Sequence, residues 1–573
     1  MASQPARTKK ILAILGVISA MALVLVLSFR LWIQPVVDQA VQLGLEQLQE
    51  RGYLVDYEKL RFYPLRRRVV LQNVLVAIDT TRIRSGTCFT ANLSKLEVKL
   101  EKYPLGENNR FLAIQRVYLK DPVVQLHSSG AFNQTDQPSE PLNYYSLIQP
   151  VLDSLSVESI RVENGLFKQL ASQETSDTLE IKGISLLLEK LYLDSLQSSQ
   201  NRGLPSIGAF TVSVDSLQQI SQDSLYAFSI AKTQINVLDS TVILHDVQVQ
   251  SNSEKFESKT YSDDQKSHWQ TQISSIRITS IHPSHWFTSR QVVSGRISID
   301  SAILKVRRNK GLRRSSRFQP LLASAMQSIP LQFKIDTITV WNSRIIYREK
   351  NTASVRAGAI SFDNLYASLY NATNFPTSHE VFEANIRTDL MNRGRFNVSL
   401  QMPLNREDGY HRLTGKLGRM HLTEMNTFLE PVAFTSVQNG VANRLSFEIE
   451  ADNHSAQGKV HFIYSGLKVS LLNQDAPQNP AIRELVGTWL ANWFVVKTNN
   501  PTRRQPLRIG NIYYQRDPSR SIFSYWCHSL LSGLKESIGL SKPDETTAST
   551  QMLAKEEESR PGLIRRIFKK SQD

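Results

Sequence analysis

Cysteine is scarce in this chain, which excludes a fold that depends on disulfide bonds. Cys88 and Cys527 are the only two cysteines in 573 residues, and they lie far apart in the sequence. Small secreted scaffolds need several bridges because they cannot bury enough apolar surface. We expect two free thiols, with one long-range bridge as the alternative.

Motifs of the common catalytic classes are also absent. The sequence has no Gly-x-x-x-x-Gly-Lys-Ser/Thr loop, no Gly-x-Ser-x-Gly elbow and no His-Glu-x-x-His pattern. The pattern Ser-x-x-Lys occurs at Ser465 and at Ser532, but the companion motifs of penicillin-binding enzymes are absent. His282 and His285 have no nearby carboxylate or cysteine to complete a metal site. We therefore expect no catalytic residue, no metal site and no cofactor, and a protein that is not an enzyme.

Long hydrophobic runs are rare, and a single one stands out. Residues 11–29 are uncharged and mostly apolar, and a helix of this length, extended by the next few residues, spans the hydrocarbon core of a bilayer. Arg7, Lys9 and Lys10 precede the run, and only Arg30 follows it closely. Because positive charge stays on the cytoplasmic side, we expect a cytoplasmic N-terminus and export of the rest of the chain.

The interpretation as a membrane anchor has one alternative, a cleaved signal peptide. Ala20-Met21-Ala22 resembles a cleavage site, but it lies inside the apolar run, which favours an uncleaved anchor. The candidate anchor residues are Ile11, Leu15, Leu23, Leu27, Phe29 and Trp32.

Apolar and basic residues are plentiful. Hydrophobic residues make up 41% of the chain, enough for a large buried surface and too much for a disordered chain. The formal net charge of +15 suits contact with anionic lipid headgroups or other acidic polymers. Nucleic acid is not an expected partner, because the bulk of the chain is predicted to be exported.

Alternation of apolar and polar residues is the main pattern after the anchor. Segments such as 95–100 and 396–400 are apolar at every second position, as half-buried strands are. Before them, residues 34–52 carry apolar residues at helical spacing and predict a short amphipathic helix. The predicted fold class is mainly β, with strands beginning near Tyr53.

A loose repeat recurs within the alternation: apolar, any, apolar, any, Asp or Asn, small, any, apolar. Its four copies begin at Val117, Ile160, Ile235 and Ile338. Asp and Asn tolerate the special dihedral angles of turns, so each copy predicts a β-hairpin. The irregular spacing of the copies favours a long meander of strands over a fixed-period solenoid or propeller.

The order of these features resembles the AsmA-like family, which includes TamB and YhdP, and in particular its single-anchor members from Bacteroidetes-type bacteria. The resemblance covers residues 1–540. It rests on the anchor, on Gly52-Tyr-Leu-Val-Asp-Tyr-Glu-Lys-Leu60, and on closing segments that include Asn499-Asn-Pro501 and Ile522-Phe-Ser-Tyr-Trp526.

This resemblance implies a long antiparallel β-sheet curled into an elongated hydrophobic groove that moves phospholipid between bacterial membranes. A β-sandwich would show the same alternation and is the alternative fold. An anchored scaffold for envelope or outer-membrane protein assembly, without lipid cargo, is the alternative function. The candidate groove-lining residues are Val117, Leu119, Ile160, Val162, Ile338 and Val340.

The expected location is the inner membrane of a Gram-negative bacterium, crossed once, with the bulk of the chain in the periplasm. Expected partners are membrane phospholipids, the inner membrane itself, and outer-membrane or envelope proteins. The predicted segments are the anchor at 1–33, the amphipathic helix at 34–52, the groove domain at 53–480, a closing block of helix and strand at 481–540, and a tail at 541–573.

The tail predicts a second membrane contact. Residues 541–559 are polar and predict a flexible tether. After Pro561, apolar and basic residues occupy opposite arcs of a helical wheel, which is typical of a helix that lies on an anionic membrane surface. A soluble basic tail is the alternative. The candidate contact residues are Leu563, Arg565, Arg566, Ile567, Phe568, Lys569 and Lys570.

Overall fold

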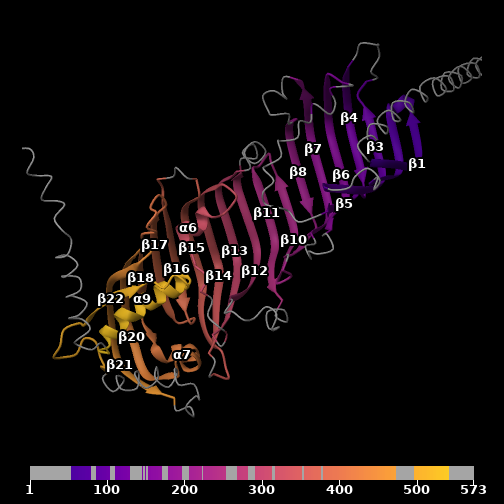
Figure 1. Ribbon diagram of the computed structural model, residues 1–573. Coiled ribbons are helices and arrows are strands. Elements are labelled where there is room, and N and C mark those ends of the chain that lie inside the picture. The colour runs from indigo at the N-terminus through magenta and orange to yellow at the C-terminus, as the bar shows by residue number, and fades with distance from the viewer. Residues whose placement is uncertain are drawn as a thin grey trace, which may run out of the picture. The chain divides into compact units, whose positions relative to one another are not determined.

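The prediction of a mainly β fold is confirmed by the computed structural model of the chain (Figure 1). Of the residues that the structure describes, 68% lie in strands, and the helices among them are few and short. The residues that the structure describes are 53–78, 86–102, 110–129, 152–170, 179–195, 205–252 without 222, 267–281, 291–310, 316–472 without 352, 353 and 376–378, and 496–540, with the single residues 145, 149 and 312. They divide between two compact units, the first formed by residues 1–258 and 270–300 and the second by residues 259–269 and 301–573.

The first unit consists of strands and one short 3-10 turn, as far as the structure describes it. Their bounds are β1 Tyr53–Tyr63, η1 Pro64–Arg66, β2 Arg68–Ile78, β3 Gly86–Leu100, β4 Phe111–Lys120, β5 Val123–Ser129, β6 Ser154–Leu170, β7 Leu179–Asp194, β8 Ser206–Val214, β9 Ser216–Ile220, β10 Tyr226–Asn236, β11 Thr241–Ser251 and β12 Ser267–Ile281. The boundaries between the units fall inside β12, whose first three residues belong to the second unit, and inside β13, Val292–Asn309.

The sheet of the first unit is mixed, so the prediction of a wholly antiparallel sheet is wrong. Most neighbouring strands pair antiparallel, but β4 and β5 both pair parallel with β6. Both also pair antiparallel with β3 on their other side, so they are two halves of one strand that is interrupted at Asp121-Pro122. Proline has no N–H to donate and Asp121 has a left-handed φ of 48°, so the ladder breaks there although the chain keeps its direction. β8 and β9 form a second broken strand between β7 and β10.

Three of the four predicted hairpins are bends within strands. The copy that begins at Ile235 is a true hairpin, in which β10 pairs antiparallel with β11. Asp121 instead separates the halves of one strand, and Asn164 and Asn342 lie inside β6 and β14 with φ values of 54° and 50°. Residues that tolerate positive φ suit a bend as well as a turn, so the sequence motif does not distinguish the two.

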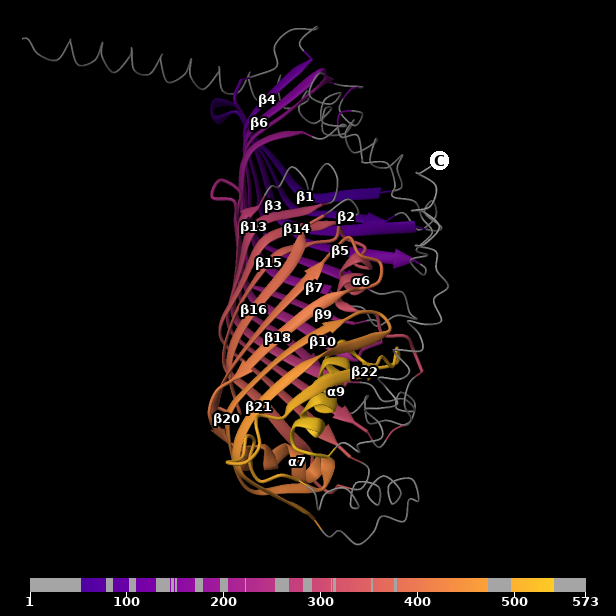
Figure 2. The same cartoon turned by 90° about the vertical axis from the view of Figure 1, so that its left-hand side faces the viewer.

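The second unit is an antiparallel sheet with helices packed against it. α9 packs on β20, β21 and β22, as Figure 2 also shows, and α7 packs mainly on β15 and β20. The bounds are α6 Leu322–Gln327, β14 Phe333–Lys350, β15 Gly358–Thr373, β16 Val381–Leu390, β17 Gly394–Pro403, β18 His411–Leu417, β19 Met420–His421, η2 Leu422–Met425, α7 Asn426–Ala433, β20 Thr435–Ala451, β21 Ser455–Leu471, β22 Ile509–Gln515 and α9 Ile522–Ser537.

The helices of the second unit close a large hydrophobic core over one face of its sheet. Ile449 and Val460 in the sheet are fully buried, and Tyr525 of α9 and Leu321, just before α6, are each 1% exposed. The buried cluster found in the first unit is much smaller and consists of Leu71, Val74 and Leu93.

Several predicted segments lie outside the described residues. They are the anchor at 1–33, the amphipathic helix at 34–52 and the tail at 541–573. None of the helices that the structure describes combines the length and hydropathy needed to cross a membrane. Cys527 is a free thiol, as predicted.

Candidate functional site

A continuous row of aliphatic side chains crosses the sheet of the first unit. The register of each strand pair places one aliphatic residue beside the next, from β1 to β12. The residues of this row, here called row one, are Leu60, Leu71, Leu96, Leu119, Val162, Leu186, Val212, Ile235, Val242 and Ile278. Each strand along the row contributes hydrocarbon, and no polar side chain interrupts it.

A second row runs alongside the first. Its members lie five positions from those of row one on every strand, as Phe167 does from Val162. Again, the register joins each member to the next across neighbouring strands. The residues of row two are Val55, Val76, Ala91, Val124, Phe167, Ile181, Leu217, Ile230, Val247 and Ile273.

In five of the ten strands that carry the rows, a left-handed residue lies between the two row members and can turn both toward the same side. In β1, Val55 and Leu60 pack against the same buried cluster. Positions five apart in a regular strand point to opposite faces, but a residue with positive φ rotates the chain and reverses the alternation. Phe362 and Leu369 of β15 demonstrate the effect, because they lie on either side of Asn364, whose φ is 50°. The ring of Phe362 lies 6.5 Å from that of Phe396, and both Phe396 and Leu369 pack against the same buried cluster. The left-handed residues between the rows are Asn73, Asp121, Asn164, Gly183 and Asp246.

Polar side chains stabilise these bends from strand to strand. The carboxylate of Asp121 accepts hydrogen bonds from the Ser94 hydroxyl at 2.9 Å and from the Asn164 amide at 2.8 Å. Asn164 and Ser94 thereby hold the pKa of the Asp121 carboxyl below its ordinary value. These hydrogen bonds link β3, the broken strand β4–β5 and β6 at the bend between row one and row two.

The two rows are accessible, unlike the core of the second unit. Every member of rows one and two is half-buried, apart from Leu71, which is buried. In the second unit, Leu400, Leu413 and Ile449 face one another across neighbouring strands and are only 5%, 5% and 0% exposed. The helix-covered face of the second unit is therefore a closed core, whereas the first unit presents a continuous hydrocarbon surface.

The structure brings four of the six predicted groove-lining residues together. Leu119 pairs with Val162 in row one, and Val117 pairs with Ile160 beside it, through the parallel β4–β6 ladder. Ile338 and Val340 lie on β14 of the second unit, where Ile338 packs against the buried cluster. A role in lining a groove stays a prediction for all six.

Sequence patterns missed the row residues of β7, β8 and β12. Leu186, Val212 and Ile278 join row one only through the strand register, which depends on pairing between distant segments. The signal that could have found Leu186 and Val212 is a spacing of five between apolar residues on each side of a Gly or an Asp, here Gly183 and Asp215.

The remaining predicted sites cannot be placed. The anchor and tail residues, and His282 and His285, lie outside the described part of the chain. Within the described part, His, Cys, Asp and Glu side chains form no group of three that could hold a metal ion. Ser465 lies in β21 and Ser532 in α9, where the Ser532 hydroxyl accepts a hydrogen bond from the backbone N–H of Tyr513 at 3.2 Å.

Comparisons with known proteins add no assignment. No protein-family model matches the sequence, and a search among curated proteins finds no similar chain.

Proposed function

We propose that this chain is a membrane-anchored, non-enzymatic protein whose first unit holds the acyl chains of phospholipids along rows one and two. The observation that carries the proposal is the pair of unbroken aliphatic rows at half-buried positions. Large exposed apolar surfaces are costly in water and mark places where a partner binds. Acyl chains suit these rows because they need only a continuous apolar surface and no hydrogen-bonding groups.

The predicted anchor gives such a surface a direct source of lipid. An apolar run at residues 11–29 would fix the N-terminal end of the chain at the inner membrane, close to β1, which begins at Tyr53. The resemblance to the AsmA-like family supports the same proposal, namely phospholipid transfer or envelope homeostasis from the periplasmic side. The scaffold without lipid cargo remains the alternative.

Replacing Val162 with Asp in the full chain tests the proposal. Val162 is half-buried, so water can reach a carboxylate there and the first unit should still fold. An acyl chain beside that charge is disfavoured by several kcal/mol, so we expect co-purifying phospholipid to fall by at least about tenfold. Lipid is measured by mass spectrometry of the purified protein, and folding by circular dichroism.

The matched control is Gln234→Asp, because Gln234 is exposed on the same sheet and precedes Ile235 of row one. This variant should keep the lipid of the parent chain. Folded Val162→Asp protein that retains the same amount of lipid as the parent would contradict the proposal. A parent chain that carries no lipid and still supports the envelope would favour the scaffold.

A further inference from the structure

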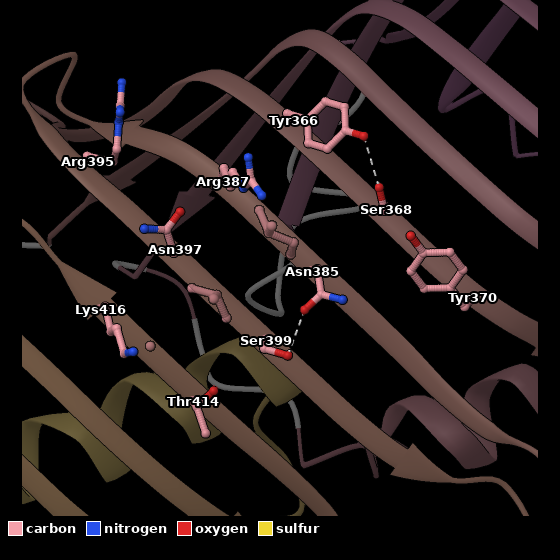
Figure 3. A pocket seen from close by; sticks show the side chains of 13 residues that line it. Tyr366, Ser368, Tyr370, Asn385, Arg387, Arg395, Asn397, Ser399, Thr414 and Lys416 are labelled. Atoms are coloured by element: carbon pink, nitrogen blue, oxygen red, sulfur yellow. Dashed lines mark hydrogen bonds between the residues drawn. The ribbon is translucent and has the colours of Figure 1, made fainter.

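A polar hollow lies on the second unit, on the face of the sheet opposite the buried core. It has a volume of about 800 Å³ and is formed by four consecutive strands, β15 to β18. Figure 3 shows that the labelled side chains include tyrosines, amides, hydroxyls and three cations. This hollow is separate from rows one and two, since it belongs to the other unit and has the opposite polarity.

The lining of the hollow contains three cations and no carboxylate. Arg387, Arg395 and Lys416 are exposed, and none of them forms an ion pair within the described part of the chain. Three carboxylates lie beside the hollow: the register places Asp389 opposite Arg395, Glu383 opposite Tyr370 and Glu448 opposite Thr414. Asp389 accepts a hydrogen bond from Asn364 at 2.9 Å, and Glu448 forms an ion pair with Arg412. No carboxylate lines the hollow, so its electrostatic field favours an anionic ligand.

The donors and aromatic rings form an ordered line across the strands. The register places Tyr366 beside Arg387, Arg387 beside Asn397 and Asn397 beside Lys416. Neighbouring strands are about 4.8 Å apart, so the line is longer than a single small anion. Trp341 extends the aromatic end, because its ring lies 6.3 Å from that of Tyr366.

The aromatic residues give the hollow a second means of recognition. Tyr366, Tyr370 and Trp341 are between 38% and 39% exposed, so their rings are available to a ligand. Aromatic side chains offer a rigid apolar surface with a polar edge, which stacks on the apolar side of a sugar ring. The Ser399 hydroxyl donates a hydrogen bond to the amide oxygen of Asn385 at 2.8 Å. The amide N–H groups of Asn385 can therefore donate to hydroxyls of a ligand.

We propose that this hollow binds an acidic oligosaccharide, a chain of sugars that carry carboxylate or phosphate groups. Tyr366, Tyr370 and Trp341 would stack on sugar rings, Arg387, Arg395 and Lys416 would bind the acidic groups, and Asn397 would donate to hydroxyls between them. Arginine is suited to the planar, two-point recognition of carboxylate and phosphate. A single phosphate ester fits less well, because it could use the cations but would leave the aromatic end of the line without a contact.

The test measures binding of defined probes to the full chain in a zwitterionic detergent. The acidic probe is a polygalacturonate fragment, and the neutral probe is the same fragment with its carboxyl groups reduced. We expect the acidic probe to bind in a salt-sensitive manner, and the triple variant Arg387→Gln, Arg395→Gln, Lys416→Gln to weaken it by roughly a hundredfold. Tyr366→Ala should weaken it by roughly tenfold. All four side chains are exposed, so the variants should keep the thermal unfolding midpoint of the parent.

The control is Arg412→Gln, which removes a cation from the same face that is already paired with Glu448. It should bind the acidic probe as the parent does. Equal binding by the parent and the triple variant would overturn the proposal, as would equal binding of the acidic and neutral probes. Glycerol phosphate that binds through the same three cations as tightly as the oligosaccharide would also overturn it, and would assign the hollow to phosphate esters such as lipid headgroups.

Discussion

Among single residues, Glu97 has the most enclosed charge on the sheet of the first unit. Its side chain is 4% exposed, and its carboxylate lies 2.8 Å from Lys95 Nζ, 3.1 Å from Arg116 Nη2 and 3.4 Å from Arg68 Nη1. Burial pushes the pKa of this carboxyl upward, but the hydrogen bond to Lys95 and the nearby positive charges outweigh burial, so the pKa lies below its ordinary value. The three strands β2, β3 and β4 are thus tied together on the face that carries no aliphatic row.

Replacing Glu97 with Gln should destabilise these strands by about 2 kcal/mol at neutral pH, because three cations lose a buried partner. A carboxyl whose pKa is lowered on folding stabilises the protein above its unfolded pKa of about 4.3 and loses that effect as the pH falls through the folded pKa. The difference between parent and variant should therefore shrink in acid.

Hydrogen exchange of the β2 to β4 amides, followed by mass spectrometry, measures this difference. The control Asp153→Asn affects an exposed pair with Arg110 and should change stability by less than about 0.5 kcal/mol. A Glu97→Gln variant that matches the parent at neutral pH would show that the cluster is not stabilising.

At the left-handed residues, the sequence predicts a positive φ but does not predict whether the chain turns or bends. Asp121, Asn164 and Asn342 are recognisable in the sequence as residues that tolerate positive φ. A turn and a bend require the same dihedral angles of one residue. Only the pairing of the flanking strands distinguishes them, and that pairing involves segments distant in the sequence. The chemistry of these positions was therefore predictable and their geometry was not.

Among the elements, helix α9 covers one face of the sheet of the second unit and thereby closes its core. It approaches β22 through two glycines, since a Cβ atom on Gly510 would lie 1.9 Å from the carbonyl oxygen of Gly533. Trp526 fastens the helix to the sheet, because its Nε1 donates a hydrogen bond to Nε2 of the buried His411 at 2.8 Å. Burial lowers the pKa of His411, which favours the neutral ring that this bond requires.

Replacing Gly533 with Ala should loosen α9. Alanine normally favours a helix over glycine by about 1 kcal/mol, but the added Cβ would lie 2.8 Å from Ile512 Cγ1 and from Val460 Cγ2. Overpacking of this kind typically costs about 1–3 kcal/mol, so we expect a net loss of stability. Hydrogen exchange of the α9 amides, followed by mass spectrometry, measures the stability of the helix. Leu531→Ala, at a 49% exposed position of α9, is the control and should have little effect, whereas a stabilised Gly533→Ala variant would contradict the tight packing.

The elements themselves were predictable in kind. Alternation identified the strands, such as 95–100 within β3 and 396–400 within β17, because a half-buried strand imposes a period of two. The packing of α9 over β20 to β22 was not predictable. It depends on the close approach of Gly510 and Gly533, and nothing in the sequence distinguishes these two glycines from the others. The parallel ladder of β4 and β6 was missed because Asp121-Pro122 suggested a reversal of the chain.

For the whole molecule, the contrast between the two units is the central result. Each has a sheet with one apolar face, but helices cover that face in the second unit, while rows one and two remain half-buried in the first. Of the candidate site, the sequence predicted that Val117, Leu119, Ile160 and Val162 face one side of their strands. It could not predict that register would extend them into continuous rows, because register is a property of pairs of strands.

The most direct test of the central claim is photocrosslinking of the full chain in living cells. A photoreactive phenylalanine analogue is placed at Leu186, in row one, or at Gln234, an exposed polar position of the same sheet. After irradiation, mass spectrometry identifies what each position has bound. We predict phospholipid adducts at Leu186 and none above background at Gln234. An absence of lipid adducts at Leu186, or equal adducts at both positions, would contradict the claim that the aliphatic rows hold acyl chains.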